Sequence, residues 1–167
     1  MNNLVALYHT PTGFDDIILR SDGEVLTGLC FARSQEIQSL PSAKSNPQAV
    51  FQGAFRWLDI YFSGKQPDFT PAYRTDNLTA FRQQVQQIIC AIPFGHTTTY
   101  GEIAKQIADQ RGLANMSAQA VGGAVGWNPI GIIVPCHRVL GADGHLTGYS
   151  GGITNKIALL RLEGCKI

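Results

Sequence analysis

Apolar residues in the first third of the chain come in short runs separated by turns. Two runs, residues 4–9 and 17–20, precede a third over 25–33, which follows the turn Ser21-Asp22-Gly23-Glu24. Runs of this length joined by turns predict a small antiparallel sheet. From 47 to 62 the apolar positions recur every three or four residues instead, which predicts a helix packed on that sheet.

A stretch rich in Gly, Pro and polar residues, 63–77, interrupts this pattern and predicts a domain boundary. The apolar positions from 78 to 92 then follow helical spacing until a Pro and a Gly end the run. We therefore expect two parts, an N-terminal α/β lobe with its linker over 1–77 and a C-terminal domain over 78–167.

Two short helices are predicted inside the second part. Thr99 and Glu102 match the ends of a capping box, so a helix should begin there. A further helix over 117–125 consists almost entirely of small residues, and the connection 110–116 between the two predicts a helix-turn-helix. The small helix would then approach another large surface closely. The alternative is that it packs tightly inside the protein's own core.

Composition limits the class of protein. The chain has 167 residues, of which 44% are apolar and 15% charged, enough for one globular unit or two small lobes. No apolar stretch reaches the roughly 20 residues of a membrane span, and the N-terminus lacks a signal-peptide pattern. We expect a cytoplasmic protein without membrane contact. The four cysteines contain no CxxC pair, which argues against a disulfide framework and against a zinc site.

Charge is uneven along the chain. Residues 1–80 hold six basic and eight acidic side chains, whereas 81–167 hold seven basic and four acidic ones. The excess in the second part is compatible with phosphate contacts but is too small to identify nucleic-acid binding.

One cysteine lies where an apolar run ends. Residues 130–134 predict a strand that stops at Pro135, and Cys136, His137 and Arg138 follow directly. A neighbouring positive charge and a base that removes the thiol proton both activate a cysteine as a nucleophile. Cys136 is therefore the candidate nucleophile, with a purely structural role for His137 as the alternative.

The Pro-Cys-His-Arg-Val sequence at 135–139 resembles the signature of the methylated-DNA:protein-cysteine methyltransferases, which repair alkylguanine in DNA by moving the alkyl group onto their own cysteine. Five further motifs follow that family's order and spacing: Thr-Tyr-Gly-Glu-Ile-Ala at 99–104, Ala-Val-Gly-Gly-Ala at 120–124, Asn-Pro at 128–129, Gly-Tyr-Ser-Gly-Gly at 148–152 and Leu-Leu-x-x-Glu at 159–163. The specific resemblance covers 78–163, and the N-terminal part is similar only in its layout of strands and a helix. The expected fold is α+β: a small N-terminal sheet with a helix, then a mostly helical C-terminal domain with a helix-turn-helix and a short strand leading to the active cysteine.

The resemblance implies a catalytic set around Cys136. Cys136 would accept the alkyl group, His137 would take the thiol proton through a water, and Glu163 would orient the imidazole. Asn128 would brace the turn that carries the cysteine.

Other residues are implied in binding the substrate. Tyr100 would help rotate the target nucleotide and, with Lys156, assist the departing guanine. The remaining positions divide into those that contact the extruded base, Tyr149, Ser150 and the backbone at Val139, and those that contact DNA, Ala118, Gln119, Ala120, Gly122, Tyr100 and Arg138. Gln119 departs from the family, whose members commonly carry an arginine there, and we expect it to fill the hole left by the flipped base with less salt dependence.

The implied partner is duplex DNA containing 6-O-alkylguanine, bound through the minor groove by a monomer without metal or organic cofactor. A thioether is not hydrolysed under mild conditions, so each molecule would act once. Three alternatives compete with this interpretation. A non-catalytic binder of alkylated DNA would not need Cys136. A thiol hydrolase would need Cys136 and His137 as a direct dyad, although the side chains of adjacent residues point apart. A helix-turn-helix regulator would not need the Pro-Cys-His-Arg turn.

Overall fold

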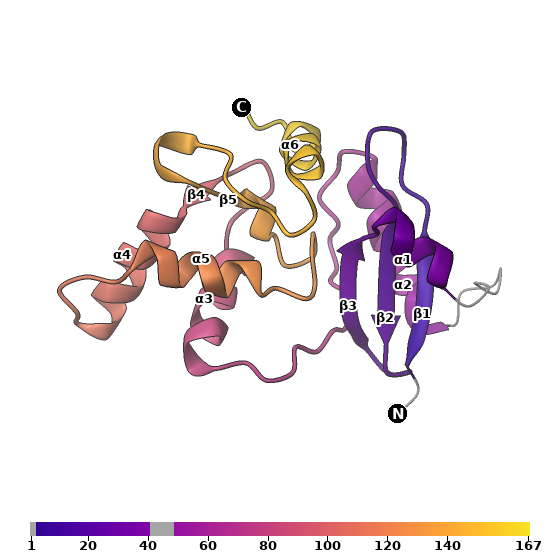
Figure 1. Ribbon diagram of the computed structural model, residues 1–167, viewed down its shortest axis with the longest axis horizontal. Helices are drawn as coiled ribbons and strands as arrows, with labels where there is room; N and C mark the ends of the chain where they lie inside the picture. The colour runs from indigo at the N-terminus through magenta and orange to yellow at the C-terminus, as the bar shows by residue number, and fades with distance from the viewer. Residues whose placement is uncertain (1–2, 41–48) are drawn as a thin grey trace. The chain divides into compact units, whose positions relative to one another are not determined.

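The computed structural model describes residues 3–40 and 49–167 and contains two compact units (Figure 1). The first comprises 1–76 together with 129–133, and the second comprises 77–128 and 134–167. The sequence placed 129–133 in the C-terminal domain. These residues belong with the first unit because the N–H of Leu29 donates to the carbonyl of Pro129 (2.9 Å) and the N–H of Gly131 donates to the carbonyl of Leu29 (2.8 Å).

In its described residues, the first unit has a three-stranded antiparallel sheet and two helices. Its strands are β1 (Leu4–Tyr8), β2 (Ile17–Ser21) and β3 (Leu26–Phe31), in the spatial order β1-β2-β3. The helices are α1 (Ser34–Ser39), which the sequence did not predict, and α2 (Ala49–Phe62). The predicted helix over 47–62 is confirmed from Ala49 onward, and its first two residues lie outside the described part. The apolar stripe of α2 is buried, as its three- and four-residue spacing requires.

The second unit is mostly helical. Four α-helices, two 3₁₀ helices and one parallel pair of two-residue strands make it up: α3 (Ala80–Cys90), β4 (Thr98–Thr99), α4 (Tyr100–Arg111), α5 (Ala118–Gly126), η1 (Cys136–Arg138), β5 (Val139–Leu140), η2 (Ala142–Gly144) and α6 (Ile153–Leu162). The α+β fold with a small N-terminal sheet and a helical second part is therefore confirmed.

The helix-turn-helix begins with the capping box that the sequence predicts. The hydroxyl of Thr99 accepts from the N–H of Glu102 (3.1 Å), and the carboxylate of Glu102 accepts from the N–H of Thr99 (2.8 Å). Gly112, at φ 65°, ends α4 in the left-handed conformation that glycine adopts without strain. Ser117 then caps α5 by accepting from the N–H of Ala120 (3.2 Å).

The expected strand over 130–134 is wrong. Ile130 makes a single bridge to Leu29, Ile132 has a φ of 65°, and the N–H of Ile133 donates back to the carbonyl of Gly131 (2.7 Å), so the segment is a series of tight turns. Ile130 and Ile132 are nonetheless buried, and burial explains the apolar run that looked like a strand. Cys136 instead begins η1, and β5 follows it. Within 3–40 and 49–167, no helix is both long and apolar enough to cross a membrane.

Candidate functional site

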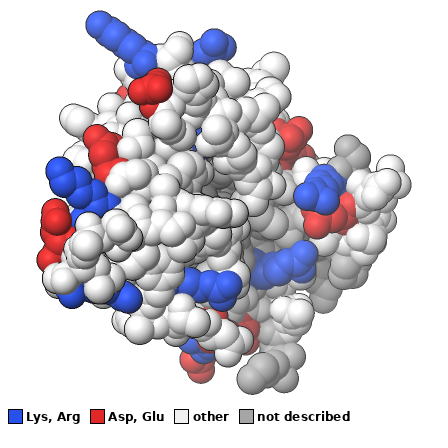
Figure 2. All heavy atoms as spheres, turned by 60° about the vertical axis from the view of Figure 1, so that its left-hand side comes forward, with Lys and Arg blue, Asp and Glu red and all other residues white. Residues whose placement is uncertain are grey.

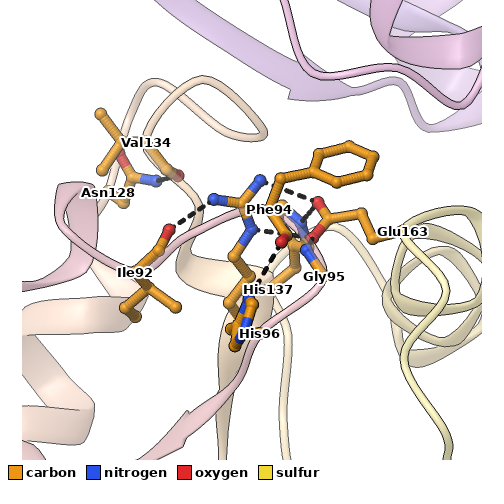
Figure 3. Close-up of polar contacts among 9 residues, drawn as sticks. Ile92, Phe94, Gly95, His96, Asn128, Val134, His137 and Glu163 are labelled. Carbon is orange, nitrogen blue, oxygen red and sulfur yellow. Dashed lines mark hydrogen bonds and ion pairs between the residues drawn. The ribbon is translucent and has the colours of Figure 1, made fainter.

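Asn128 fixes the turn that carries Cys136. Its amide nitrogen donates to the carbonyl of Val134 (2.9 Å) and to the sulfur of Cys136 (3.2 Å), and the first of these bonds is drawn in Figure 3. The N–H of Cys136 also donates to the carbonyl of Val134 (2.8 Å). One side chain thus braces the backbone and presents a hydrogen-bond donor to the sulfur, where negative charge would develop on ionisation.

Cys136 is only 5% exposed, yet it lines a cavity. The cavity has a volume of about 350 Å³, a size typical of a small-molecule pocket. It is lined also by Tyr100, Gly122, Val125, Gly126, Thr147, Gly148, Tyr149 and Ser150. Tyr149 and Ser150, which are expected from the sequence to contact an extruded base, thus line the same cavity as Cys136.

Cys136 needs a base before it can act as a nucleophile. Burial raises the pKa of its thiol, while the hydrogen bond from Asn128 and the charge of Lys156 act in the opposite direction. The resting residue is therefore a protonated thiol at neutral pH, and its reactivity depends on a group that removes the proton.

His137 is held by Glu163. The imidazole Nε2 lies 2.7 Å from Glu163 Oε1, and both side chains are fully buried (Figure 3). Burial lowers the pKa of His137, against the opposing effect of the Glu163 carboxylate. Because the carboxylate only accepts hydrogen bonds, Nε2 carries the proton and Nδ1 keeps the lone pair. The ring is thus a neutral base with a defined basic nitrogen.

Arg138 contradicts the expectation that it contacts DNA. The side chain is buried, and its Nε and Nη2 donate to the two oxygens of Glu163 at 2.9 and 3.0 Å. The third donor, Nη1, is bound to the carbonyl of Ile92 at 2.7 Å. With its side chain only 8% exposed, this guanidinium is not presented at the surface, where a phosphate would bind. Sequence alone did not indicate this partner, because Glu163 lies 25 residues further along the chain.

Lys156 is fully buried beside the site. Its ammonium donates to the carbonyl of Val139 (2.6 Å) and to that of Thr147 (3.1 Å). Burial lowers the pKa of Lys156, and the charge of an ionised Cys136 acts in the opposite direction. The carbonyl of Val139, whose backbone is expected to contact the extruded base, thus accepts a hydrogen bond from Lys156.

Tyr100, the first residue of α4, is half-buried and lines the Cys136 cavity. Burial and the charge of an ionised Cys136 raise the pKa of its phenol, and a hydrogen bond with the Thr147 side chain opposes them. Tyr100 therefore stays a protonated donor at neutral pH. Thr147, which touches both Tyr100 and Lys156, was not foreseen from the sequence.

A second hollow, of about 940 Å³, lies along α4 and α5. It is lined by Ala118, Gln119, Gly122 and Gly123 of α5, among other residues, and Tyr100 and Gly122 line both hollows. Ala120 is exposed on the same helix but does not line it. Figure 2 shows one face of the molecule, on which Lys and Arg side chains are scattered rather than gathered into a stripe.

The small residues of α5 are not explained by internal packing alone. Val121 and Val125 form its buried side. A Cβ added at Gly122 would lie 3.9 Å from the ring of Tyr100, an ordinary contact, and one added at Gly123 or Gly126 would meet nothing within 4 Å. Packing inside the protein therefore does not require the small residues on the outward side of α5.

In the described part of the chain, no group of three or more His, Cys, Asp and Glu side chains is arranged to hold a metal ion. The groups around the site include the Cys136 thiol, the His137 imidazole, the Tyr100 phenol and the Lys156 ammonium.

Fold and site together define a protein with a nucleophilic cysteine next to a helix-turn-helix. Family models match both parts of the chain, "6-O-methylguanine DNA methyltransferase, ribonuclease-like domain" over residues 3–76 and "6-O-methylguanine DNA methyltransferase, DNA binding domain" over 80–165. The chain therefore belongs to the 6-O-methylguanine DNA methyltransferase family.

Relatives at high identity span nearly the whole chain. The methylated-DNA–protein-cysteine methyltransferase of Haemophilus influenzae is 38% identical over 162 residues, 96% of this chain and 88% of the relative. That of Mycobacterium bovis is 45% identical over 147 residues, 88% of this chain and 85% of the relative. Among solved structures, Mycobacterium tuberculosis OGT in complex with DNA is similar with a TM-score of 0.73 at 40% identity, covering 95% of this chain and 92% of that one.

Proposed function

We propose that the protein repairs DNA by transferring the alkyl group of 6-O-alkylguanine in a duplex to the sulfur of Cys136, once per molecule. The observation that carries this proposal is a thiol that lines a cavity beside a buried, carboxylate-bound imidazole. Family membership and the DNA complex of a relative at 40% identity support DNA as the partner.

The reaction is a displacement at the alkyl carbon. The thiol proton of Cys136 passes through a water to Nδ1 of His137, and the thiolate forms a bond to the alkyl carbon as the bond from that carbon to guanine O6 breaks. The electron pair goes to the guanine, which takes a proton from the Tyr100 hydroxyl while the charge of Lys156 stabilises the leaving base. Asn128 supplies a hydrogen bond to the sulfur before attack. The thioether product is stable, so the molecule is spent.

The base must leave the helix to reach Cys136, because O6 of a stacked guanine is inaccessible to a buried thiol. Tyr100 and Gly122 line both the hollow along α4 and α5 and the Cys136 cavity. This shared lining supports a path for the base from DNA bound at the hollow to the sulfur of Cys136. The slim outward side of α5 would enter the minor groove. Exposed Gln119 would occupy the space of the flipped base, and as a neutral residue it adds nothing to the salt dependence.

One chain supplies every residue of this mechanism, which supports action as a monomer. The mechanism also needs a reduced Cys136. No disulfide joins cysteines of the described residues, and a cytoplasmic location, where thiols stay reduced, suits such a nucleophile.

Mass spectrometry after incubation with duplex DNA containing 6-O-methylguanine tests the proposal. We expect a gain of one methyl group, about 14 Da, on the peptide that contains Cys136. Cys136→Ser should abolish the gain, whereas Cys90→Ser, which changes an exposed cysteine, should leave it intact. Repeated turnover by unmodified protein would indicate a hydrolase instead, and DNA binding without modification would indicate a non-catalytic binder.

A further inference from the structure

The carboxylate of Glu163 receives hydrogen bonds from three residues. Oε1 accepts from His137 Nε2 (2.7 Å) and Arg138 Nη2 (3.0 Å). Oε2 accepts from Arg138 Nε (2.9 Å) and from the backbone N–H of Gly95 (3.1 Å). Figure 3 shows these contacts converging on Glu163. Both carboxylate oxygens of Glu163 are therefore hydrogen-bonded to groups other than His137.

We propose that Arg138 and Gly95 form a clamp that positions Glu163, and through it the imidazole of His137, for proton removal from Cys136. The inference rests on the proposed function for its kinetic consequences only. The residues of the clamp touch neither the cavity nor the sulfur, so they are positioning residues.

Gly95 meets a requirement that only glycine satisfies. Its φ is 76°, and a Cβ added there would lie 2.9 Å from the backbone oxygen of Glu163. Both the left-handed backbone and the close approach exclude a side chain. This approach is what brings the Gly95 N–H to the Glu163 carboxylate.

Arg138 suits the clamp because of its shape as well as its charge. A guanidinium offers two parallel N–H groups to a carboxylate, and here a third reaches the carbonyl of Ile92, just beyond the end of α3. Lysine in its place would keep the charge and lose the paired geometry. The Ile92 contact also fixes the direction from which the guanidinium approaches Glu163.

The clamp also affects the charge around His137. Glu163 is the negative group in contact with the ring, while Arg138 and Lys156 are the positive groups near it, and Cys136 becomes negative when it ionises. Without the Arg138 charge, the Glu163 carboxylate would favour imidazolium, so the pKa of His137 would rise. A protonated ring cannot accept the thiol proton.

The clamp can be tested without DNA by following the ring nitrogens of His137 by NMR as a function of pH. The chain has four histidines, so assignment by substitution is practicable. We expect Arg138→Met to raise the pKa of His137 by about one unit. Arg161→Met removes a positive charge from the exposed end of α6 and should leave the titration unchanged, as the matched control.

Single-turnover transfer from 6-O-methylguanine duplex then measures the kinetic effect. In Arg138→Met, we expect the pH below which the transfer rate falls to rise by as much as the pKa of His137 rises. Arg138→Lys should titrate close to wild type but transfer about tenfold more slowly at unchanged DNA affinity, because the paired contact is lost. If Arg138→Met does not fold, the transfer rate of Arg138→Lys tests the clamp.

The clamp is overturned if the folded Arg138→Met protein titrates at His137 as wild type does, or if Arg138→Lys transfers at the wild-type rate. Failure of the proposed function has a different signature. In that case wild-type Cys136 would gain no alkyl group while the NMR titrations still separated Arg138→Met from Arg161→Met.

Discussion

At the scale of single residues, the reactivity of Cys136 depends on opposing influences on one sulfur atom. Burial raises the pKa of the thiol, and the amide of Asn128, 3.2 Å from the sulfur, is the largest influence that lowers it. A buried thiol that is still reachable from a cavity is protected from random oxidation and reacts mainly with what the cavity admits.

Replacing Asn128 by Ala should therefore raise the pKa of Cys136 further. A group whose thiolate loses a hydrogen bond ionises at higher pH, so the rate of alkylation by iodoacetamide at Cys136 should shift by about one unit toward alkaline pH. Peptide mass spectrometry reads this rate for each cysteine in the same sample, and exposed Cys90 is the internal control. An unchanged profile at Cys136 would show that Asn128 braces the turn without stabilising the thiolate.

The misassignment of Arg138 shows what single residues do not reveal in a sequence. Cys136, His137 and Arg138 are neighbours in the chain, and their residue types predict a nucleophile with a base beside it. Nothing in that local pattern indicates that Arg138 turns toward Glu163 and away from the surface. Residue type predicts what a group can do, whereas its tertiary partner decides what it does.

At the scale of elements, prediction succeeded where the signal is local. The capping box of α4 depends on Thr99 and Glu102, three residues apart, and formed as the sequence indicated. The strand predicted over 130–134 was wrong because a run of apolar residues indicates burial but does not determine backbone angles. The positive φ of Ile132 therefore could not be predicted from the sequence.

The outward side of α5 allows a test that separates packing from binding. Gly123 faces open space, so Gly123→Leu should raise the free energy of unfolding, by up to about 1 kcal/mol, since leucine is a far better helix former than glycine. The same side chain would obstruct close approach of DNA. Fluorescence anisotropy with 6-O-methylguanine duplex, in the Cys136→Ser background, should show at least about tenfold weaker binding.

Gly53 in α2 offers the matched control for this helix. It is also exposed on a helix, and a Cβ there would meet nothing within 4 Å. Gly53→Leu should change stability in the same direction without affecting DNA binding. Equal affinities of the two variants would exclude α5 as the DNA-facing helix.

At the scale of the whole molecule, the two units cannot be separated by one cut in the chain. Residues 129–133 belong to the first unit, although they lie between α5 and Cys136 of the second. Asn128 and Val134 flank this segment, and the hydrogen bond from the Asn128 amide to the carbonyl of Val134 joins its two ends. The sequence predicted a boundary near residue 77 from its Gly, Pro and polar residues, but a segment that returns later leaves no such mark.

Removal of residues 1–76 should therefore destabilise what remains. A fragment of 77–167 loses Leu29, whose N–H and carbonyl bind the Pro129 carbonyl and the Gly131 N–H, and it exposes Ile130 and Ile132, which are 0% and 2% exposed in the full chain. We expect a lower unfolding temperature by circular dichroism. We also expect slower single-turnover transfer, because Asn128 and Val134, which flank 129–133, hold the turn that carries Cys136. If the fragment unfolded at the temperature of the full chain and transferred at its rate, the second unit would be self-sufficient and the 129–133 pairing would contribute nothing to the Cys136 turn.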